Sequence, residues 1–264
     1  MTQTAVGDER LNSLVEFAGL LADEARRVTT KYFRTPVAAE IKPDASPVSI
    51  ADREVEAVIR GMIEEAYPDH GIFGEEEAPV RIDARYVWVV DPIDGTKSFL
   101  IGNPLFGTLI GLLRDGLPVV GIIDHSALDE RWTGARGQVT TFNGTPVLSR
   151  RCVDISQAWL TATSPTMFKE DQIDAFNRLA GACRYVRWGA DCMGYGLLAS
   201  GFLDVVCEAT MDPHDYIAVV AVIEGADGVV TDWMGRPLGL EGDGTVLACG
   251  DPALHRTALG ILNG

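Results

Sequence analysis

Apolar residues recur with a helical period in two segments near the start of the chain. Over residues 9–34 they stand three or four positions apart, from Leu11 to Ala25, and charged residues occupy the other face. This spacing predicts an amphipathic helix that ends before Pro36. The same period between about Ile50 and Ala66 predicts a second helix, and the prolines between Ile41 and Ser49 predict an irregular connection.

Continuous apolar runs bounded by turn residues follow the two helices and predict strands. The first two are Ile72 to Gly74 and Tyr86 to Val90. Phe106 to Leu113 and Leu117 to Ile123 are separated by Arg114-Asp115-Gly116, which predicts a hairpin.

From about residue 155 the pattern changes to short strands that alternate with helices. The expected strands are 158–163, 183–188, 202–207, 228–232 and 245–249, and the expected helices are 169–180, 191–200, 214–225 and 252–262. The fold class predicted is α/β, with an α+β half over residues 1–150 and an α/β half over residues 151–264. We expect the two layered halves to share one cleft.

Composition narrows the classes of partner. The chain has 264 residues, 47% of them hydrophobic, which suffices for a globular core. Lys and Arg together number 22 and Asp and Glu 38, which gives a net charge of −16. This charge argues against nucleic acid and anionic membranes as partners. An anionic substrate therefore needs cations at its own site.

The cysteines and the apolar runs bear on the compartment. None of the five cysteines forms a C-x-x-C pair, which argues against a disulfide framework and a thiolate zinc site. No apolar run reaches the roughly 18 residues of a membrane helix. We expect a cytoplasmic protein.

Two acids stand directly after the apolar run that ends at Val90, in Asp91-Pro92-Ile93-Asp94-Gly95-Thr96. Carboxylates beside a core are costly unless a partner compensates them, and a divalent cation is one such partner. A plain Asx turn is the alternative. Gly95 and Thr96 stand where a helix begins, so their N–H groups are candidates for binding an anion.

Two further acids occur in similar contexts. Glu75 follows the short strand that ends at Gly74, and Asp215 stands at the start of an apolar helix. Oxygen ligands from separate loops suit Mg²⁺ rather than zinc. The alternatives are a solvated acidic loop for Glu75 and a helix-capping acid for Asp215.

In combination, three motifs resemble the inositol monophosphatase family. They are Gly74-Glu75-Glu76, Trp88-x-x-Asp91-Pro92-Ile93-Asp94-Gly95-Thr96, and His214-Asp215 before Glu224-Gly225-Ala226-x-Gly228, within a resemblance over residues 10–260. The resemblance implies a layered αβαβα sandwich, usually a homodimer, with two or three Mg²⁺ ions in each active site. The implied metal ligands are Glu75, Asp91, the carbonyl of Ile93, Asp94 and Asp215. The implied substrate contacts are Asp94, Gly95, Thr96, Gly189, Ala190, Asp191 and Glu208.

Within this family the chain is most similar to the histidinol-phosphate phosphatase branch. The stretches that carry the similarity are 94–110, Arg187-Trp188-Gly189-Ala190-Asp191-Cys192, 201–204 and 231–235. Ala190 and His214 depart from the branch, which commonly has a second Gly and a Tyr there.

The resemblance also implies a water activated by metal and positioned by Glu75 and Thr96. Inositol phosphatases place a further acid where this chain has Ser46, and we expect Asp44 to act instead. A loop acid paired with Lys42 is the alternative for Asp44.

A pocket that binds the ammonium group of histidinol phosphate is expected to contain a carboxylate. Asp191 and Glu208 are the candidates, although Asp191 also fits a helix N-cap. Arg187 contacts either the substrate or a surface acid.

Three functions remain open. The first is Mg²⁺-dependent hydrolysis of L-histidinol phosphate to L-histidinol and phosphate, in histidine biosynthesis. The second is the same reaction on inositol 1-phosphate or another small phosphorylated alcohol. The third is a regulatory protein that binds metal or phosphate without turnover, which is disfavoured because every motif acid is present.

Overall fold

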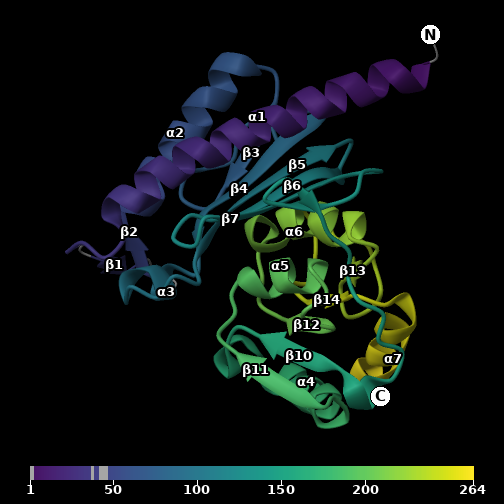
Figure 1. Ribbon diagram of the computed structural model, residues 1–264. Helices are drawn as coiled ribbons and strands as arrows, with labels where there is room; N and C mark the ends of the chain where they lie inside the picture. Colours follow the sequence, from purple (N-terminus) through teal and green to yellow (C-terminus); the bar gives the residue numbers. More distant parts are fainter. Residues whose placement is uncertain (1–2, 37–38, 42–46) are drawn as a thin grey trace.

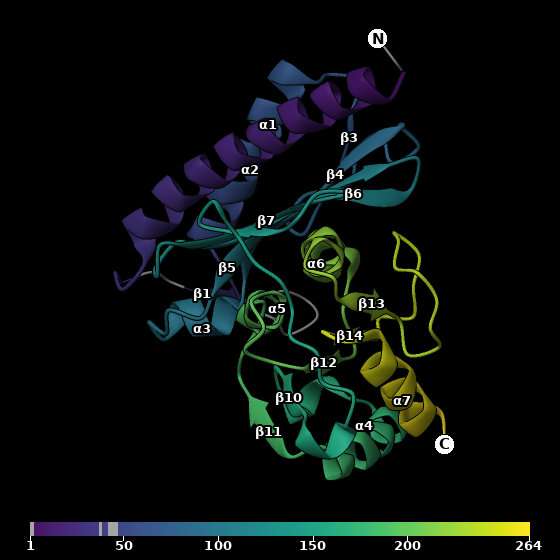
Figure 2. The same cartoon turned by 45° about the vertical axis from the view of Figure 1, so that its right-hand side comes forward.

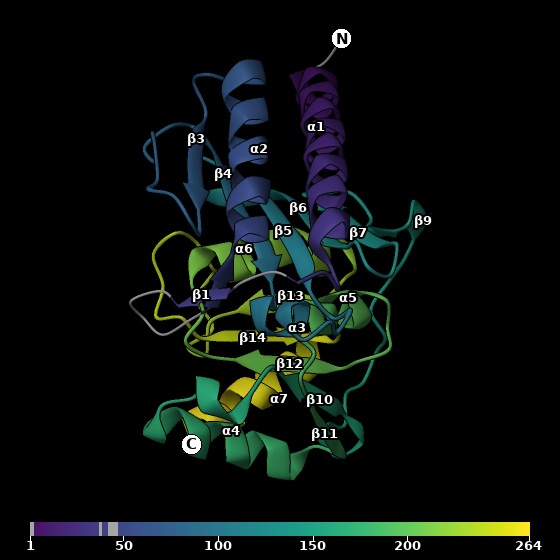
Figure 3. The same cartoon turned by 90° about the vertical axis from the view of Figure 1, so that its left-hand side faces the viewer.

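The protein is an αβαβα sandwich, seen here in a computed structural model that describes residues 3–36, 39–41 and 47–264 (Figure 1). Helices α1 (Gln3–Tyr32) and α2 (Ile50–Ala66) form one outer layer and lie side by side (Figure 3). Helices α4 (Glu170–Ala182) and α7 (Pro252–Asn263) form the other, and α5 (Met193–Ala199) and α6 (Pro213–Gly225) lie between the two sheets (Figure 2). The predicted α/β class and layered sandwich are confirmed.

The sheet next to α1 and α2 is seven-stranded and runs in the order β3-β4-β5-β6-β7-β8-β9. Its strands are β3 (Gly71–Gly74), β4 (Tyr86–Asp94), β5 (Gly107–Arg114), β6 (Leu117–His125), β7 (Glu130–Ala135), β8 (Thr141–Phe142) and β9 (Thr145–Pro146). Strand β3 pairs in parallel with β4, and the remaining pairs are antiparallel. The predicted hairpin is the turn between β5 and β6.

The second sheet is five-stranded, in the order β11-β10-β12-β14-β13. Its strands are β10 (Trp159–Ala162), β11 (Tyr185–Trp188), β12 (Val205–Glu208), β13 (Val229–Thr231) and β14 (Val246–Cys249). Strand β10 is parallel to β11 and β12, whereas β14 runs antiparallel to β12 and β13. The expected alternation of strands and helices is therefore realised as a mixed sheet.

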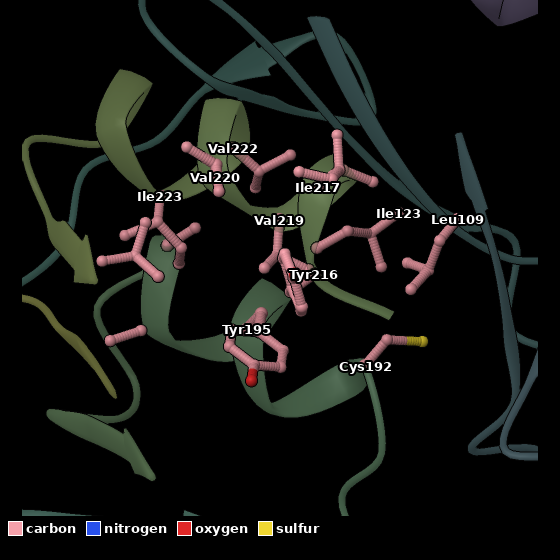
Figure 4. Close-up of a cluster of buried hydrophobic side chains, with 14 of the residues drawn as sticks. Leu109, Ile123, Cys192, Tyr195, Tyr216, Ile217, Val219, Val220, Val222 and Ile223 are labelled. Atoms are coloured by element: carbon pink, nitrogen blue, oxygen red, sulfur yellow. The ribbon is translucent and has the colours of Figure 1, made fainter. Parts of the chain in front are cut away.

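Helix α6 forms the centre of the core. Its residues Tyr216 to Ile223 are all buried, as expected for a helix that is apolar all round. Close approach to the first sheet requires glycine on the strands: a Cβ at Gly121 would stand 1.8 Å from the carbonyl oxygen of Ala218. Figure 4 shows the side chains of α6 beside those of Tyr195 and Cys192 from the neighbouring helix segment. The helix that carries Asp215 is thus rigidly held.

One short segment differs from the prediction. The connection expected to be irregular contains strand β2 (Pro47–Ser49), which pairs antiparallel with β1 (Ala39–Ile41). Pro47 is the first residue of its strand, a position that tolerates the missing N–H group. Helix α3 (Thr96–Leu100) and the 3-10 turns Ile155–Gln157 and Pro165–Met167 complete the described elements. No helix of the described residues is long and apolar enough to cross a membrane.

Candidate metal and phosphate site

Four predicted acids gather where β4 ends. Carboxylate oxygens of Asp91, Asp94 and Asp215 lie within 4.8 Å of one another. Oxygens of Glu75 and Asp91 and a ring nitrogen of His214 lie equally close together. The residues come from strand β4, the loop after β3 and the first turn of α6. The parallel pairing of β3 with β4 brings the loop of Glu75 to the end of β4.

Local structure directs these side chains. The pairing of β4 with β5 is irregular between Asp91 and Asp94, as in a β-bulge, and such an irregularity re-aims side chains. Asp215 is the third residue of α6, and its Oδ2 accepts a hydrogen bond of 2.7 Å from the N–H of Asp212. Asp215 therefore does cap the helix, while its Oδ1 lies 3.5 Å from Nε2 of His214. Capping and membership of the acidic cluster are compatible.

Burial and mutual repulsion disfavour the ionised forms of the clustered carboxylates. Burial, reinforced by Glu75, Asp94 and Asp215, raises the pKa of Asp91 well above its usual range. Burial and the nearby Asp191 do the same to the pKa of Asp94. Burial raises the pKa of Asp215 to about 7. Such shifts mark sites where ionised carboxylates lack compensating charge.

The donor set fits a divalent cation. Oδ1 of Asp91 is buried, and among the described residues no group donates a hydrogen bond to it. Within the same part of the chain, no Lys or Arg forms an ion pair with Asp91 or Asp94. Uncompensated buried carboxylates are costly, and a hard cation satisfies them with the oxygen ligands it prefers.

Thr96 lies beside an acid that the sequence reasoning missed. Its hydroxyl donates to the carbonyl of Ile93 at 3.1 Å and lies 3.5 Å from Oδ1 of Asp52. Asp52 is 1% exposed, and burial raises its pKa, with Glu75 adding to the shift. The expected Asp44 lies outside the described residues.

A local explanation concealed Asp52 in the sequence. The spacing Ser49-x-x-Asp52 is a helix capping box, and the structure contains it: the N–H and hydroxyl of Ser49 both donate to Oδ2 of Asp52. The other oxygen, Oδ1, is the one turned to Thr96. One feature of the sequence points to Asp52: it ends the same segment, residues 42–52, that contains Asp44.

Asp191 lies against the turn at Gly95. Gly95 has a φ of 78°, and a Cβ there would stand 3.0 Å from Oδ2 of Asp191. The same oxygen accepts a hydrogen bond of 2.9 Å from Ser98. The N-cap of α5 is Cys192, so Asp191 does not cap this helix. The N–H of Cys192 instead donates to Oδ2 of Asp94 at 2.7 Å.

Glu208 is buried and hydrogen-bonded to neighbouring residues of the protein. It is 2% exposed. Its Oε1 accepts from the N–H and hydroxyl of Thr163, and its Oε2 accepts from the hydroxyl of Tyr195 at 2.7 Å. Both oxygens are thus engaged within the protein.

The remaining predicted substrate residues line a neighbouring groove. Arg187, Gly189 and Ala190 border a cavity of about 350 Å³ together with Trp188 and Phe202. The guanidinium of Arg187 is exposed and has no hydrogen bond or ion pair within residues 3–36, 39–41 and 47–264. The surface salt bridge considered for Arg187 is therefore not formed among these residues.

The chain belongs to the inositol monophosphatase family, whose model it matches over residues 10–263. It is therefore a phosphatase of a metal-dependent family, in agreement with the acidic cluster described above.

Its relatives carry more than one substrate in their names. The chloroplastic bifunctional phosphatase IMPL2 of Arabidopsis thaliana is 42% identical over 263 residues, 96% of this chain and 76% of that protein. The histidinol-phosphatase of Chlorobaculum parvum is 37% identical over 86% of this chain and 89% of its own. The structure of an inositol monophosphatase from Zymomonas mobilis superposes with a TM-score of 0.88 and 40% identity, covering 96% of this chain and 98% of the other.

Proposed function

We propose that this phosphatase hydrolyses L-histidinol phosphate with Mg²⁺ as its metal, as a step of histidine biosynthesis. The proposed substrate rests mainly on the position of Asp191. Its half-buried carboxylate accepts a hydrogen bond from Ser98 and lies against the turn at Gly95. A carboxylate there complements an ammonium group, which histidinol phosphate has and inositol phosphate lacks. The name of the Chlorobaculum parvum relative points the same way.

The proposed ligands of two or three Mg²⁺ ions are Glu75, Asp91, the carbonyl of Ile93, Asp94 and Asp215. When bound, the ions would neutralise phosphate charge, lower the pKa of water and stabilise the leaving oxygen. The protein's part is to hold the carboxylates in fixed directions, through the α6 cap for Asp215 and the N–H of Cys192 for Asp94. Burial raises the pKa values of Asp91 and Asp94, and a cation beside them would favour their ionised forms.

We assign to Asp52 the role expected of Asp44, because Asp52 is the acid that faces Thr96. With the Ile93 carbonyl engaged by a metal ion, the Thr96 hydroxyl, now 3.1 Å from that carbonyl, would turn its proton to Oδ1 of Asp52 at 3.5 Å and leave an oxygen lone pair for a water. Thr96 and Glu75 would orient that water, and its proton would pass to the carboxylate of Glu75 during in-line attack on phosphorus. The N–H groups at the start of an α-helix have no acceptor within the helix, so those of Gly95 and Thr96 at the start of α3 would bind the phosphate oxygens.

Asp191 rather than Glu208 is proposed as the carboxylate for the ammonium group. Both oxygens of Glu208 already accept hydrogen bonds, so Glu208 shapes the pocket through Tyr195 and Thr163. Gly189 and Ala190 would border the substrate's ring, and Arg187 the outer edge of the groove.

A side-by-side assay of phosphate release tests the substrate. With Mg²⁺, kcat/KM for L-histidinol phosphate should exceed that for inositol 1-phosphate by about 100-fold, since an unpaired buried polar group costs about 1–3 kcal/mol or more. Faster turnover of inositol 1-phosphate would establish the second candidate, a phosphatase for another small alcohol phosphate. No turnover of any ester would favour the regulatory role.

We also propose that the protein is a cytoplasmic homodimer. The supporting feature for the dimer is the exposed apolar surface of Trp159, Trp188 and Phe202, three residues at the border of the groove of about 350 Å³ that are exposed by 40%, 39% and 67%. Contiguous exposed apolar residues are typical of interfaces. Light scattering after size exclusion should give twice the chain mass, and Phe202→Asp should shift it to the monomer. A monomeric wild-type protein at micromolar concentration would contradict the dimer.

A further inference from the structure

A second acid of α2 holds the loop that carries Glu75. Glu56 lies one helical turn after Asp52 and is fully buried. Its Oε2 accepts a hydrogen bond of 2.7 Å from the N–H of Glu76, and its Oε1 accepts one of 3.1 Å from the N–H of Glu77. A side chain of the helix thus binds the two residues that directly follow Glu75.

Arg60 fixes this carboxylate from the other side. Its Nε donates to Oε1 of Glu56 at 2.7 Å, and its NH2 group donates to the carbonyl of Glu77 at 2.8 Å. The side chain of Arg60 is 10% exposed, so the ion pair is largely shielded from water. Charge-assisted hydrogen bonds of this kind hold their geometry more firmly than neutral ones.

The strand before the loop is shaped to admit Glu56. A Cβ on Gly74 would stand 2.0 Å from Oε1 of Glu56 and 2.8 Å from its Oε2. Only a residue without a side chain leaves room for the carboxylate at this point. Glu56 and Gly74 therefore form a matched pair directly beside Glu75.

Two acids of helix α2 contact two different parts of the candidate site. Asp52 and Glu56 are four residues apart and share one face of the helix. Asp52 is turned to Thr96, and Glu56 to the loop of Glu75. The helix sets the distance between the groups that are proposed to orient the attacking water.

We propose that Glu56 is a positioning residue that fixes the direction of the Glu75 carboxylate through the N–H groups of Glu76 and Glu77. The proposal rests on the proposed function of Glu75 as a metal ligand. A carboxylate that supports a ligand from the outer shell typically affects metal affinity by about 10–100-fold. Glu56 contributes to metal binding without touching the metal or the substrate.

The variant Glu56→Gln tests this role. An amide offers one acceptor oxygen, so its NH2 group must face an N–H group of the loop or Arg60, and at least one hydrogen bond is lost. Mn²⁺ binding without substrate, followed by the EPR signal of the free ion, should weaken by about 10-fold or more. In assays with L-histidinol phosphate, high Mg²⁺ should restore kcat, while KM stays within twofold of wild type. A residue that serves stability alone would not shift metal affinity in this way.

Glu64→Gln is the matched control. Glu64 is on the same helix, and its exposed side chain pairs with Arg81, so the change of charge is identical and its distance from the loop is greater. Its Mn²⁺ affinity should stay within twofold of wild type. If Glu56→Gln folds and binds Mn²⁺ as tightly as Glu64→Gln, the proposal is wrong.

Gly74→Ala is a second variant that tests the same role of Glu56 if Glu56→Gln does not fold. The added methyl group displaces the Glu56 carboxylate without removing charge, and Mn²⁺ binding should weaken as above. Unchanged affinity in a folded Gly74→Ala protein would overturn the proposal. Failure of the proposed function gives a different result, because wild type itself would then neither bind Mn²⁺ nor hydrolyse a phosphate ester.

Discussion

Asp91 combines a functional demand with a cost in stability. It is 3% exposed, and its Oδ1 accepts no hydrogen bond within the described part of the chain. Asn at this position keeps the shape and removes the charge that Glu75, Asp94 and Asp215 oppose. A group that costs stability in the absence of its ligand is retained for binding that ligand.

Asp91→Asn should therefore lower activity and stabilise the metal-free protein. We expect kcat/KM to fall by about 1,000-fold or more, because a ligand to the catalytic metal is lost. In EDTA the melting temperature should rise by roughly 2–4 °C, as relief of one buried repulsion contributes about 1 kcal/mol. Differential scanning calorimetry and a phosphate-release assay measure the two effects. A variant that keeps full activity would remove Asp91 from the metal site.

His214 gives this chain a nitrogen donor near its carboxylates. A ring nitrogen lies within 4.8 Å of oxygens of Glu75 and Asp91, and the ring stacks on Phe73 with centroids 6.4 Å apart. Imidazole suits Zn²⁺ and Ni²⁺, whereas Mg²⁺ prefers oxygen ligands. The structure thus predicts a metal preference shifted towards transition metals.

His214→Phe preserves the stacking and removes the nitrogen. The ratio of Zn²⁺ to Mg²⁺ affinity should fall by about 5-fold or more, because imidazole suits Zn²⁺ and oxygen ligands suit Mg²⁺. Titration calorimetry of the metal-free protein measures both constants. An unchanged ratio would show that the imidazole does not contact the ion.

At the scale of elements, the residues just before α5 contact α3 at the candidate substrate pocket. Asp191 has a φ of 46° and is held by Ser98 of α3. Asp191→Ala should raise KM for L-histidinol phosphate by about 10–100-fold, the loss expected for a charged hydrogen bond. KM for a phosphate ester without an ammonium group should change by less than threefold.

Asp227→Ala is the control for Asp191→Ala, because Asp227 also has a positive φ, 63°, and lies on the surface. It carries the same backbone strain and the same change of charge. If the two variants have equal KM values for L-histidinol phosphate, Asp191 does not bind the ammonium group.

Patterns along the chain predicted most elements because burial imposes a local period. The all-apolar stretch of α6 and the hairpin at Gly116 are examples, and both occur as expected. The acids of β4 and α6 were predicted as one site only through the family resemblance. Contacts such as Thr96 with Asp52, which are 44 residues apart, leave no periodic trace. Glu56 likewise looks like an ordinary charged residue of an amphipathic helix until the loop is seen to fold onto it.

At the scale of the whole molecule, an acidic site lies within an acidic protein. The net charge is −16, and the clustered carboxylates add a local repulsion. Repulsion of this kind destabilises the compact state and is relieved by protons or by cations. Protons and Mg²⁺ should therefore compete for the site and substitute for each other in stabilising the fold.

The competition predicts how stability depends on pH. The pKa of Asp215 is about 7 in the folded protein and 3.8 ordinarily, so the folded state binds the proton more tightly. Its contribution to stability is complete below the ordinary value and is lost as the pH rises through about 7. Between about pH 5.5 and 8 the metal-free protein should lose on the order of 2 kcal/mol, or roughly 4–8 °C in melting temperature. Added Mg²⁺ should raise the melting temperature more at pH 8, where the carboxylate is ionised.

Asp215→Asn isolates this effect from the general charge of the protein, because both the pH dependence in EDTA and the response to Mg²⁺ should become flatter. Melting curves for Asp215→Asn with the same pH slope as wild type would show that another group governs the stability.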